Sequence, residues 1–333
     1  MNNQEMNEIY DLIHTYKIGK LIESPLPVSG GLMHKMYKVV TDTRVYAIKC
    51  LNPTIMKRKG VVDNMIQAER IAVEFSGYLP VVAAIDFDGS PILHINHKYY
   101  MLFPWVEGTS LFPPSINVKN CYEIGSVLGK IHKLNISVPE VEKGNIQSIN
   151  YNWHEYYEKG VEQKTAWIDI YGKSIDKLNH WTSQVNEANS ILSECMVISH
   201  RDLDPKNVMW EEEKPYLIDW EAAGYVNPYQ ELLEMLIYWS DNGEGELDKK
   251  NFNSLLNAYR SYMTTNHIDW DYVLDSGYAG MLGWLGYSLN RALGMESVDV
   301  EEQKLGAKQV IDTITALNKY NHQKKAIKIW LSE

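Results

Sequence analysis

Cysteine is scarce in this chain of 333 residues. The three cysteines, Cys50, Cys121 and Cys195, lie far apart and form none of the closely spaced pairs that bind zinc. They are also too few for the disulfide framework that stabilises many small secreted domains. We therefore expect the protein to reside in a reducing compartment. A content of 45% hydrophobic and 23% charged residues is typical of a globular protein.

Long apolar runs and an excess of basic residues are absent as well. No stretch approaches the roughly 20 apolar residues that span a bilayer, and the N-terminus lacks the cationic segment and apolar core of a signal peptide. These features predict a cytoplasmic protein with no membrane partner. The net charge of −11 disfavours nucleic acid as a partner, because phosphate backbones require a basic surface. The same charge favours a cationic small molecule.

The length of the chain exceeds the size at which single cores usually divide, so two lobes are expected. We place the smaller lobe at residues 1–103 and the larger at residues 108–333, with a hinge at residues 103–108. The smaller lobe begins with a helix over residues 1–18. One face of this helix is apolar and carries Ile9, Leu12, Ile13 and Tyr16.

The larger lobe is helical by pattern. Amphipathic stretches at residues 118–134 and 273–293 have apolar residues at the spacing of a helix. Aromatic residues concentrate between residues 151 and 181, where Trp153, Trp167 and Trp181 are more typical of core positions than of a cation cage. The sequence gives no indication of the oligomeric state.

The segment with the clearest chemistry is His-Arg-Asp-Leu-Asp-Pro-Lys-Asn at residues 200–207. Asn207 follows Asp202 by five positions, and Asp219 follows it by seventeen after a short apolar strand. Phosphoryl transfer needs little covalent work from a protein, which must instead hold Mg²⁺, the phosphates and an acceptor hydroxyl in line. A carboxylate and an amide carbonyl are sufficient protein ligands for Mg²⁺. We therefore assign Asn207 and Asp219 to Mg²⁺ and Asp202 to the proton of the acceptor hydroxyl.

Such a site requires a cation upstream that binds the α- and β-phosphates. Tyr46-Ala47-Ile48-Lys49 alternates as a half-buried strand does, and it places Lys49 in this role. Residues 60–75 follow with the apolar period of a helix, and Glu69 on this helix is the expected partner of Lys49. Glu74 is the second candidate. The alternative is that both glutamates are solvated helix charges.

Adjacent glycines lie in the loop at residues 28–37, between two apparent strands. We expect the backbone N–H groups of Ser29, Gly30 and Gly31 to cover the phosphates, because glycine permits close approach. The spacing lacks the G-x-G-x-x-G pattern of protein kinases, so an ordinary hairpin turn is the alternative.

The order of these motifs resembles the aminoglycoside phosphotransferase and choline kinase branch of the kinase-like fold, over approximately residues 20–295. Residues 200–207 match the kinase catalytic-loop pattern H-R-D-L-x-x-x-N, and residues 46–49 are similar to its V-A-I-K strand. The resemblance implies an α+β fold with two lobes: a small antiparallel sheet with one main helix, and a larger, mostly helical lobe. It also implies ATP or GTP as the phosphate donor, together with Mg²⁺.

In register with this family, residues 99–108 resemble the kinase hinge. Phe103 takes the gatekeeper position, the carbonyl of Pro104 would accept from the purine amino group, and the Val106 N–H would donate to the ring. Two short strands are predicted before this segment, with turns at residues 88–89 and 94–97.

Several residues depart from protein kinases. Asp219-Trp220-Glu221 stands where those enzymes have D-F-G, and no A-P-E sequence or long activation segment follows. His200 and Arg201 are accordingly expected to have local structural roles. The site is expected to be permanently assembled for a small acceptor.

Two kinds of contact could bind the acceptor, and the sequence does not decide between them. Carboxylates could pair with ammonium groups, and Asp241 and Glu244 stand where antibiotic kinases of this family place acidic contacts. Aromatic faces such as Trp284 could instead surround a quaternary ammonium, with Arg291 at the border of the pocket. The predicted acceptor is an aminoglycoside-type antibiotic or a related amino alcohol, and antibiotic resistance is the corresponding role. The alternatives are a metabolic kinase for choline, homoserine or a sugar, and a kinase-like scaffold without activity.

Overall fold

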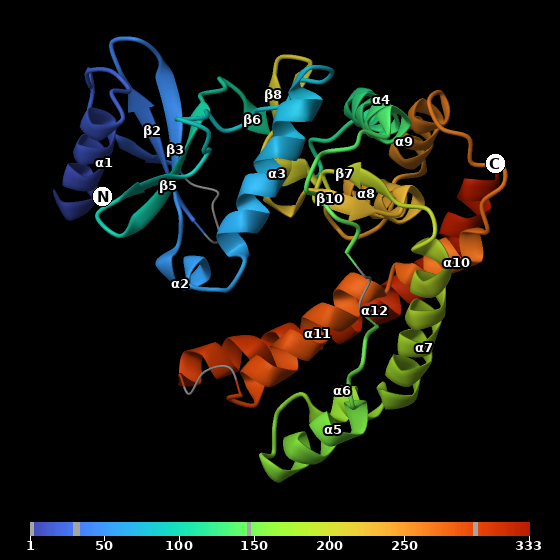
Figure 1. The fold of residues 1–333 in the computed structure, drawn as a ribbon. Helices are drawn as coiled ribbons and strands as arrows, with labels where there is room; N and C mark the ends of the chain where they lie inside the picture. Colours follow the sequence, from blue (N-terminus) through green and yellow to red (C-terminus); the bar gives the residue numbers. More distant parts are fainter. Residues whose placement is uncertain (1–2, 29–33, 145–147, 296–298) are drawn as a thin grey trace. The chain divides into compact units, whose positions relative to one another are not determined.

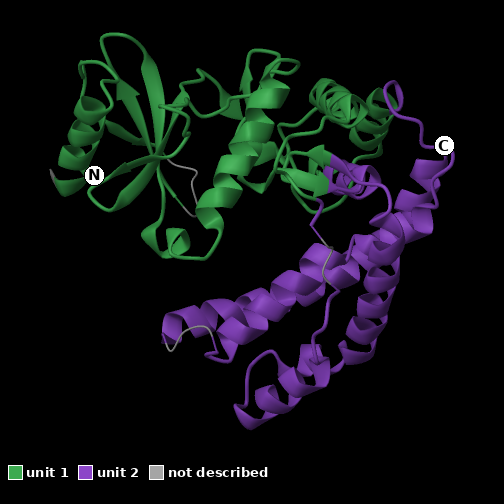
Figure 2. Cartoon of the chain, in the orientation of Figure 1, with its two compact units in different colours: residues 1–142, 198–225, 238–259 green, residues 143–197, 226–237, 260–333 purple. Residues whose placement is uncertain are grey.

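The computed structural model describes residues 3–28, 34–144, 148–295 and 299–333. The chain divides into two compact units (Figure 2), and each unit is discontinuous in sequence. Unit 1 comprises residues 1–142, 198–225 and 238–259, and unit 2 comprises residues 143–197, 226–237 and 260–333. The predicted lobe boundary at residues 103–108 falls within unit 1 and stays a prediction.

Unit 1 begins with a five-stranded antiparallel sheet in the order β1-β2-β3-β5-β4. Its strands are Leu26–Val28 (β1), Lys35–Val40 (β2), Val45–Cys50 (β3), Leu93–Ile95 (β4) and Lys98–Pro104 (β5). Helix α1, Asn3–Thr15, covers one face of this sheet (Figure 1) and buries Ile9, Leu12 and Ile13 against it. The helix predicted over residues 1–18 is present over residues 3–15, and Tyr16 of the predicted apolar face lies just beyond its end.

The other face of the sheet carries a different set of side chains, because successive residues of a strand alternate between faces. Lys49 pairs with Met36 on one side and Met101 on the other, so these three side chains share one face. Ala47 and Phe103, which also pair, lie on this same face. Tyr46 and Ile48 lie on the opposite face, in the core under α1.

Two helices follow β3 on the Lys49 face. They are α2, Pro53–Met56, and α3, Val61–Ser76, and they form a second apolar cluster in which Met56 and Met65 pack against Met101. Residue 60 before α3 has φ +81°, which glycine adopts without strain. The predicted helix is confirmed. Ala72 and Phe75 are buried on its inner face, whereas Val73 is 54% exposed.

The rest of unit 1 includes the predicted catalytic segment, residues 200–207. A three-stranded antiparallel sheet has the order β6-β8-β9, with β6 Thr109–Ser110, β8 Val208–Glu211 and β9 Lys214–Leu217. Two 3-10 turns, η1 (Pro205–Asn207) and η2 (Trp220–Ala222), lie next to β8 and β9 in the sequence. Helices α4, Val118–Leu134, and α9, Lys249–Arg260, approach closely at Gly125, where a Cβ atom would lie 2.2 Å from the Leu255 carbonyl oxygen. The strands β7, Val197–Ser199, and β10, Gly224–Val226, form a two-stranded sheet.

Unit 2 is helical. Its helices are α5 (Trp153–Glu162), α6 (Ile168–Gly172), α7 (Ile175–Leu192), α10 (Trp270–Ser276), α11 (Ala279–Ala292) and α12 (Val300–Ser332). Helix α8, Pro228–Ser240, contributes its residues to 237. Trp153, Trp167 and Trp181 are each no more than 2% exposed, so they are core residues. Together with the antiparallel sheet of unit 1, these helices confirm the predicted α+β class.

The predicted continuous helix at residues 273–293 is wrong, because α10 ends before Gly277 and α11 begins after Tyr278. The Tyr320 hydroxyl donates to the Leu274 carbonyl at 2.6 Å, and that carbonyl would otherwise accept from Tyr278 N–H. Tyr278 N–H instead contacts the Asp275 carbonyl. A Cβ atom at residue 277 would lie 2.2 Å from the Tyr320 hydroxyl, so glycine makes room for this contact.

None of the helices in the described ranges has an apolar stretch that could cross a bilayer. The cytoplasmic location stays a prediction.

Candidate active site

The predicted catalytic segment is held together by the amide of Asn207. Its Nδ2 group donates to the backbone carbonyl of Asp202 at 2.7 Å and to the Asp202 carboxylate at 2.9 Å. Both amide hydrogens are thereby directed at Asp202, and the Oδ1 atom of Asn207 is the atom left for a cation. Burial raises the pKa of the Asp202 carboxyl, although the nearby Lys206 opposes this shift. A raised pKa suits a carboxylate that accepts a proton.

His200 fixes this segment to the strand that leads to Asp219. Its Nδ1 atom accepts from Asp202 N–H at 3.3 Å, so the protonated Nε2 donates to the Ile218 carbonyl at 2.9 Å. Ile218 N–H in turn donates to the Asn207 carbonyl at 3.0 Å. His200 is fully buried against the Trp220 ring. This geometry is that of a structural residue, and it brings Asp202, Asn207 and Asp219 to one place.

Lys49 reaches the same place from β3. Its ammonium lies 2.7 Å from Asp219 Oδ1 and 2.7 Å from Glu221 Oε2, and the residue is 8% exposed. Burial alone lowers the pKa of Lys49, but the two carboxylates raise it above its ordinary value. Lys49 is therefore a charged lysine between two acids, one of which is a predicted Mg²⁺ ligand.

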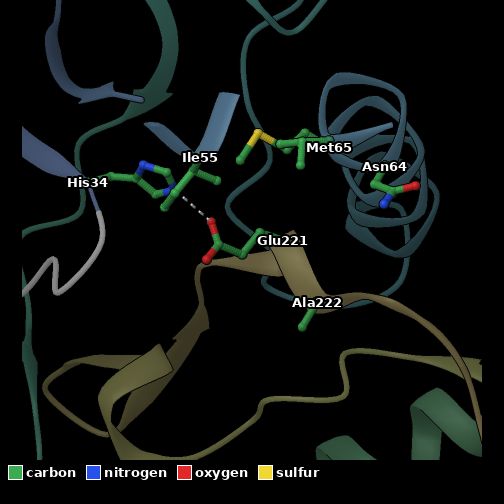
Figure 3. A pocket seen from close by; sticks show the side chains of 7 residues that line it. His34, Ile55, Asn64, Met65, Glu221 and Ala222 are labelled. Atoms are coloured by element: carbon green, nitrogen blue, oxygen red, sulfur yellow. Dashed lines mark ion pairs between the residues drawn. The ribbon is translucent and has the colours of Figure 1, made fainter. Parts of the chain in front are cut away.

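Glu221, one of the two carboxylates at Lys49, also pairs with His34, and Figure 3 shows this second pair. His34 Nδ1 accepts from Asn52 N–H at 3.0 Å, which leaves the protonated Nε2 facing Glu221 Oε2 at 3.5 Å. The hydrogen bond from His34 and the charge of Lys49 lower the pKa of Glu221 to about 2. A hollow of about 280 Å³ opens beside this pair, lined by Ile55, Val61, Asn64, Met65 and Ala222 as well.

The hinge segment continues β5. Phe103 lies opposite Ala47 and Pro104 opposite Tyr46 in the sheet, and Trp105 N–H donates to the Val45 carbonyl at 3.2 Å. Phe103 is half-buried on the Lys49 face, whereas Pro104 is exposed. The roles of Phe103, Pro104 and Val106 stay predictions. Ser29, Gly30 and Gly31 lie outside the described residues.

Comparison with known proteins identifies the family. The model of the phosphotransferase enzyme family matches residues 25–263. The chain belongs to this phosphotransferase family. The predicted enzyme class, a small-molecule kinase, is confirmed at the level of the family.

Relatives of this phosphotransferase are distant in sequence. Protein LicA homolog of Mycoplasma capricolum subsp. capricolum is 26% identical over 193 residues, which cover 57% of this chain and 71% of the relative. Spectinomycin phosphotransferase, solved with ADP and spectinomycin, superimposes with a TM-score of 0.67 at 14% identity, covering 94% of this chain and 98% of the other. The ethanolamine kinase of Plasmodium vivax gives a TM-score of 0.59 at 15% identity, covering 91% and 86%. These two likenesses confirm the predicted kinase-like fold.

The candidate acceptor residues of the phosphotransferase have varied surroundings. In unit 1, Asp241 Oδ1 accepts from the N–H groups of Gly243 and Gly245 at 2.6 and 3.3 Å, and Glu244 is exposed in the same loop. In unit 2, Arg291 is paired with Glu302. Trp284 is 48% exposed on α11 and lies beside the Tyr287 ring, with the ring centroids 5.3 Å apart. Their roles toward an acceptor stay predictions.

Three residues of the site had no predicted role. Glu221 is the third residue of Asp219-Trp220-Glu221, and His34 lies in the loop at residues 28–37, but neither motif predicts a contact with Lys49 or between the two residues. Lys206 occupies a variable position within the catalytic-loop pattern, yet its ammonium lies 3.3 Å from the Asp202 carboxylate. Its position four residues after Asp202, on a tight turn, was the available signal.

Glu69, the predicted partner of Lys49, has a different contact in this structure. Its Oε2 atom accepts from Ala84 N–H at 2.7 Å, and no ion pair joins it to Lys49 within the described part of the chain. Burial raises the pKa of Glu69 to about 7 from the ordinary 4.5, even though the Ala84 N–H lowers it. The folded protein therefore retains a proton between pH 4.5 and 7 that the unfolded chain releases.

Replacing Glu69 by glutamine is accordingly expected to stabilise the protein at pH 8. The contribution of protonated Glu69 to the free energy of unfolding is complete below pH 4.5 and is lost as the pH rises through 7. The wild type therefore becomes less stable over that interval. Glutamine keeps an acceptor for Ala84 N–H and does not ionise. The expected gain in the free energy of unfolding is on the order of 3 kcal/mol, at about 1.4 kcal/mol for each pKa unit.

Denaturant unfolding at pH 5 and pH 8 measures this gain. Glu74→Gln, on the exposed side of the same helix, is the matched control and should change neither value. Identical pH dependence in wild type and Glu69→Gln would show that Glu69 does not hold a proton in the folded state.

Proposed function

We propose that this phosphotransferase moves the γ-phosphoryl group of ATP or GTP to a hydroxyl group of a small molecule that carries an amine. The observation that supports this most strongly is the contact between Asn207 and Asp202. One amide holds the carboxylate that would take the proton, and its carbonyl oxygen stays available to a cation. The proposed proton acceptor and the proposed metal ligand are thus joined by two hydrogen bonds.

The residues present fit Mg²⁺. Asn207 Oδ1 and the Asp219 carboxylate are oxygen donors, and the hydrogen bond from Ile218 N–H to the Asn207 carbonyl keeps the two residues adjacent. No cluster of three or more His, Cys, Asp or Glu residues suited to a metal occurs in the described part of the chain. Mg²⁺ does not require one, since it binds through one or two protein ligands, phosphates and water. When bound, it would neutralise charge on the β- and γ-phosphates.

The remaining roles belong to side chains of unit 1. Lys49 would exchange one of its two carboxylate partners for the α- and β-phosphates. Its ammonium has three donors, which are enough for the remaining carboxylate and the phosphates. Glu221, held by His34, would keep the ammonium in position before the nucleotide arrives. Asp202 would accept the proton of the acceptor hydroxyl as that oxygen attacks the γ-phosphorus. The Lys49 face of the sheet, with Ala47 and Phe103, would receive the purine.

An amine-bearing acceptor is favoured by two observations. The chain carries a net charge of −11, which attracts cations. The two structural neighbours described above are named for spectinomycin and ethanolamine, which both carry amine and hydroxyl groups. Asp241 and Glu244 in unit 1 are the proposed partners of an ammonium group. The alternative is an aromatic contact in unit 2 through Trp284, with Arg291 beside it. Choline, homoserine and sugars are the alternative acceptors, with metabolism as the role in place of antibiotic resistance.

The experiment is a transfer assay followed by ³¹P NMR. The protein is incubated with MgATP or MgGTP and, one at a time, spectinomycin, other aminoglycosides, ethanolamine, choline, homoserine and a hexose. A new phosphomonoester signal, equal in amount to the nucleoside diphosphate formed, supports the proposal and identifies the acceptor. If the signal appears only with homoserine or only with the hexose, the acceptor is a metabolic molecule and the proposed amino alcohol is wrong.

A scaffold protein gives a different result in the same assay. It binds nucleotide without forming a phosphomonoester with any acceptor. Expression in a susceptible bacterium then separates the two roles of an active enzyme, because only an antibiotic kinase raises the tolerated concentration of the drug.

A further inference from the structure

Lys206 contacts the Asp202 carboxylate, which also accepts from the Asn207 amide. Its ammonium is 3.3 Å from Oδ1 and 3.3 Å from Oδ2 of Asp202, and the side chain is 46% exposed. The turn η1 produces this placement. Asp204 accepts from Lys206 N–H at 2.9 Å and begins the turn, Pro205 occupies its first position, and the Lys206 side chain folds back over Asp202.

The resting partner of Lys206 is Asp204, whose Oδ2 atom lies 2.7 Å from the ammonium. An ammonium has three donors, and the contacts to Asp202 and Asp204 use two of them. A half-exposed lysine on a flexible four-carbon stem can direct the third donor to a new acceptor without breaking the turn. Lys206 thus holds a positive charge beside the proposed proton acceptor, with one donor left for a further acceptor.

We propose that Lys206 is a further catalytic residue, whose ammonium donates a hydrogen bond to the phosphoryl group during its transfer. The inference rests on the proposed function. In the step, the acceptor oxygen forms a bond to the γ-phosphorus and its proton passes to Asp202. The bond from phosphorus to the β,γ-bridging oxygen breaks, and the nucleoside diphosphate leaves with that electron pair.

The distances around Asp202 support a contact between Lys206 and the transferring phosphoryl group. A hydroxyl that gives its proton to Asp202 lies about 2.6–3.2 Å from a carboxylate oxygen. The Lys206 ammonium contacts the same carboxylate oxygens of Asp202, so the ammonium and the acceptor oxygen would be neighbours. The oxygens of the transferred group are one bond from the phosphorus that the acceptor oxygen attacks, which brings them within reach of the ammonium. Negative charge is spread over these oxygens in the transition state, and a fixed donor stabilises it there.

The competing explanation is that Lys206 only neutralises Asp202 and Asp204. That role would stabilise the resting enzyme and would contribute equally before and during transfer. Binding of a transition-state analogue separates the two explanations, because only a contact made to the transferring group strengthens with the analogue.

The test measures the affinity of the full-length protein for MgADP and for MgADP with aluminium fluoride, by isothermal titration calorimetry. The variants are Lys206→Met and Lys206→Arg. Lys119→Met is the matched control, since Lys119 pairs with Glu213 on the surface and both side chains are more than 80% exposed. The thermal unfolding midpoint of each variant shows that it is folded.

In the wild type, aluminium fluoride is expected to tighten MgADP binding. In Lys206→Met most of that gain should disappear, about 100-fold if Lys206 acts like one donor of an oxyanion hole, while the affinity for MgADP alone stays unchanged. Lys206→Arg should recover part of the gain, and Lys119→Met all of it. A full gain in Lys206→Met overturns the inference and leaves the proposed function standing. A wild type that binds neither ligand overturns the proposed function and the inference with it.

Discussion

Replacing Asp202 by asparagine is expected to lower kcat by about 1,000-fold while the KM for the nucleotide changes little. A positioned general base contributes about 10²–10⁴ in rate, and asparagine cannot accept the proton. The substitution keeps the geometry, because an amide oxygen at position 202 can still accept from Asn207 Nδ2 at the observed 2.9 Å. The loss should therefore appear in the chemical step alone. The measurement is steady-state kinetics with the acceptor identified by the transfer assay.

Glu213→Gln is the matched control for this variant. It also converts a carboxylate to an amide in unit 1, but at an 85% exposed side chain that pairs only with Lys119 among the described contacts. Its kcat should equal that of the wild type. If Asp202→Asn retained more than a tenth of the wild-type kcat, the proton would have another acceptor and the role of Asp202 would be wrong.

Replacing Lys49 by methionine is expected to lower kcat/KM for the nucleotide by about 100- to 1,000-fold. Lys49 is the cation nearest to Asp219 and Glu221, and removing one partner of a charge pair costs about 2–5 kcal/mol. The variant also loses the donor for the α- and β-phosphates. Both effects weaken nucleotide binding, so KM should rise together with the fall in kcat.

A double variant separates these two effects. Glu221→Gln removes one of the two charges that Lys49 neutralises, so Lys49→Met/Glu221→Gln should unfold at a higher temperature than Lys49→Met. Nucleotide binding should not recover, because the phosphate donor is still missing. Recovery of both properties would mean that Lys49 serves only to neutralise the carboxylates, and Lys119→Met is again the surface control.

The parts of the site that the sequence predicted are those that lie within single motifs. Asp202 and Asn207 are five residues apart, so their contact follows from one tight turn, and Lys49 is fixed by the alternation of β3. The paired strands and the lead-in helix follow from apolar period in the same way. These features depend on neighbours in the chain, which is why pattern alone was sufficient.

Contacts between distant segments could not be predicted in that way. His34 reaches Glu221 only because β2, the segment after β3 and the turn after β9 meet in the folded unit. Glu69 accepts from Ala84 N–H, and Leu274 accepts from the Tyr320 hydroxyl, which divides a helix that the period predicted as continuous. The acceptor site depends on similar tertiary contacts, so its residues stay predictions.

The most direct test of the account is a crystal structure of the protein with Mg²⁺ and a non-hydrolysable ATP analogue. We expect Asn207 Oδ1 and an Asp219 carboxylate oxygen about 2.0–2.1 Å from Mg²⁺, which is the usual length of such bonds. Lys49 should contact the α- and β-phosphates, and Asp202 should face the γ-phosphate without touching the metal. Phosphates bound elsewhere, or a metal held by neither Asn207 nor Asp219, would contradict the assignment of this site.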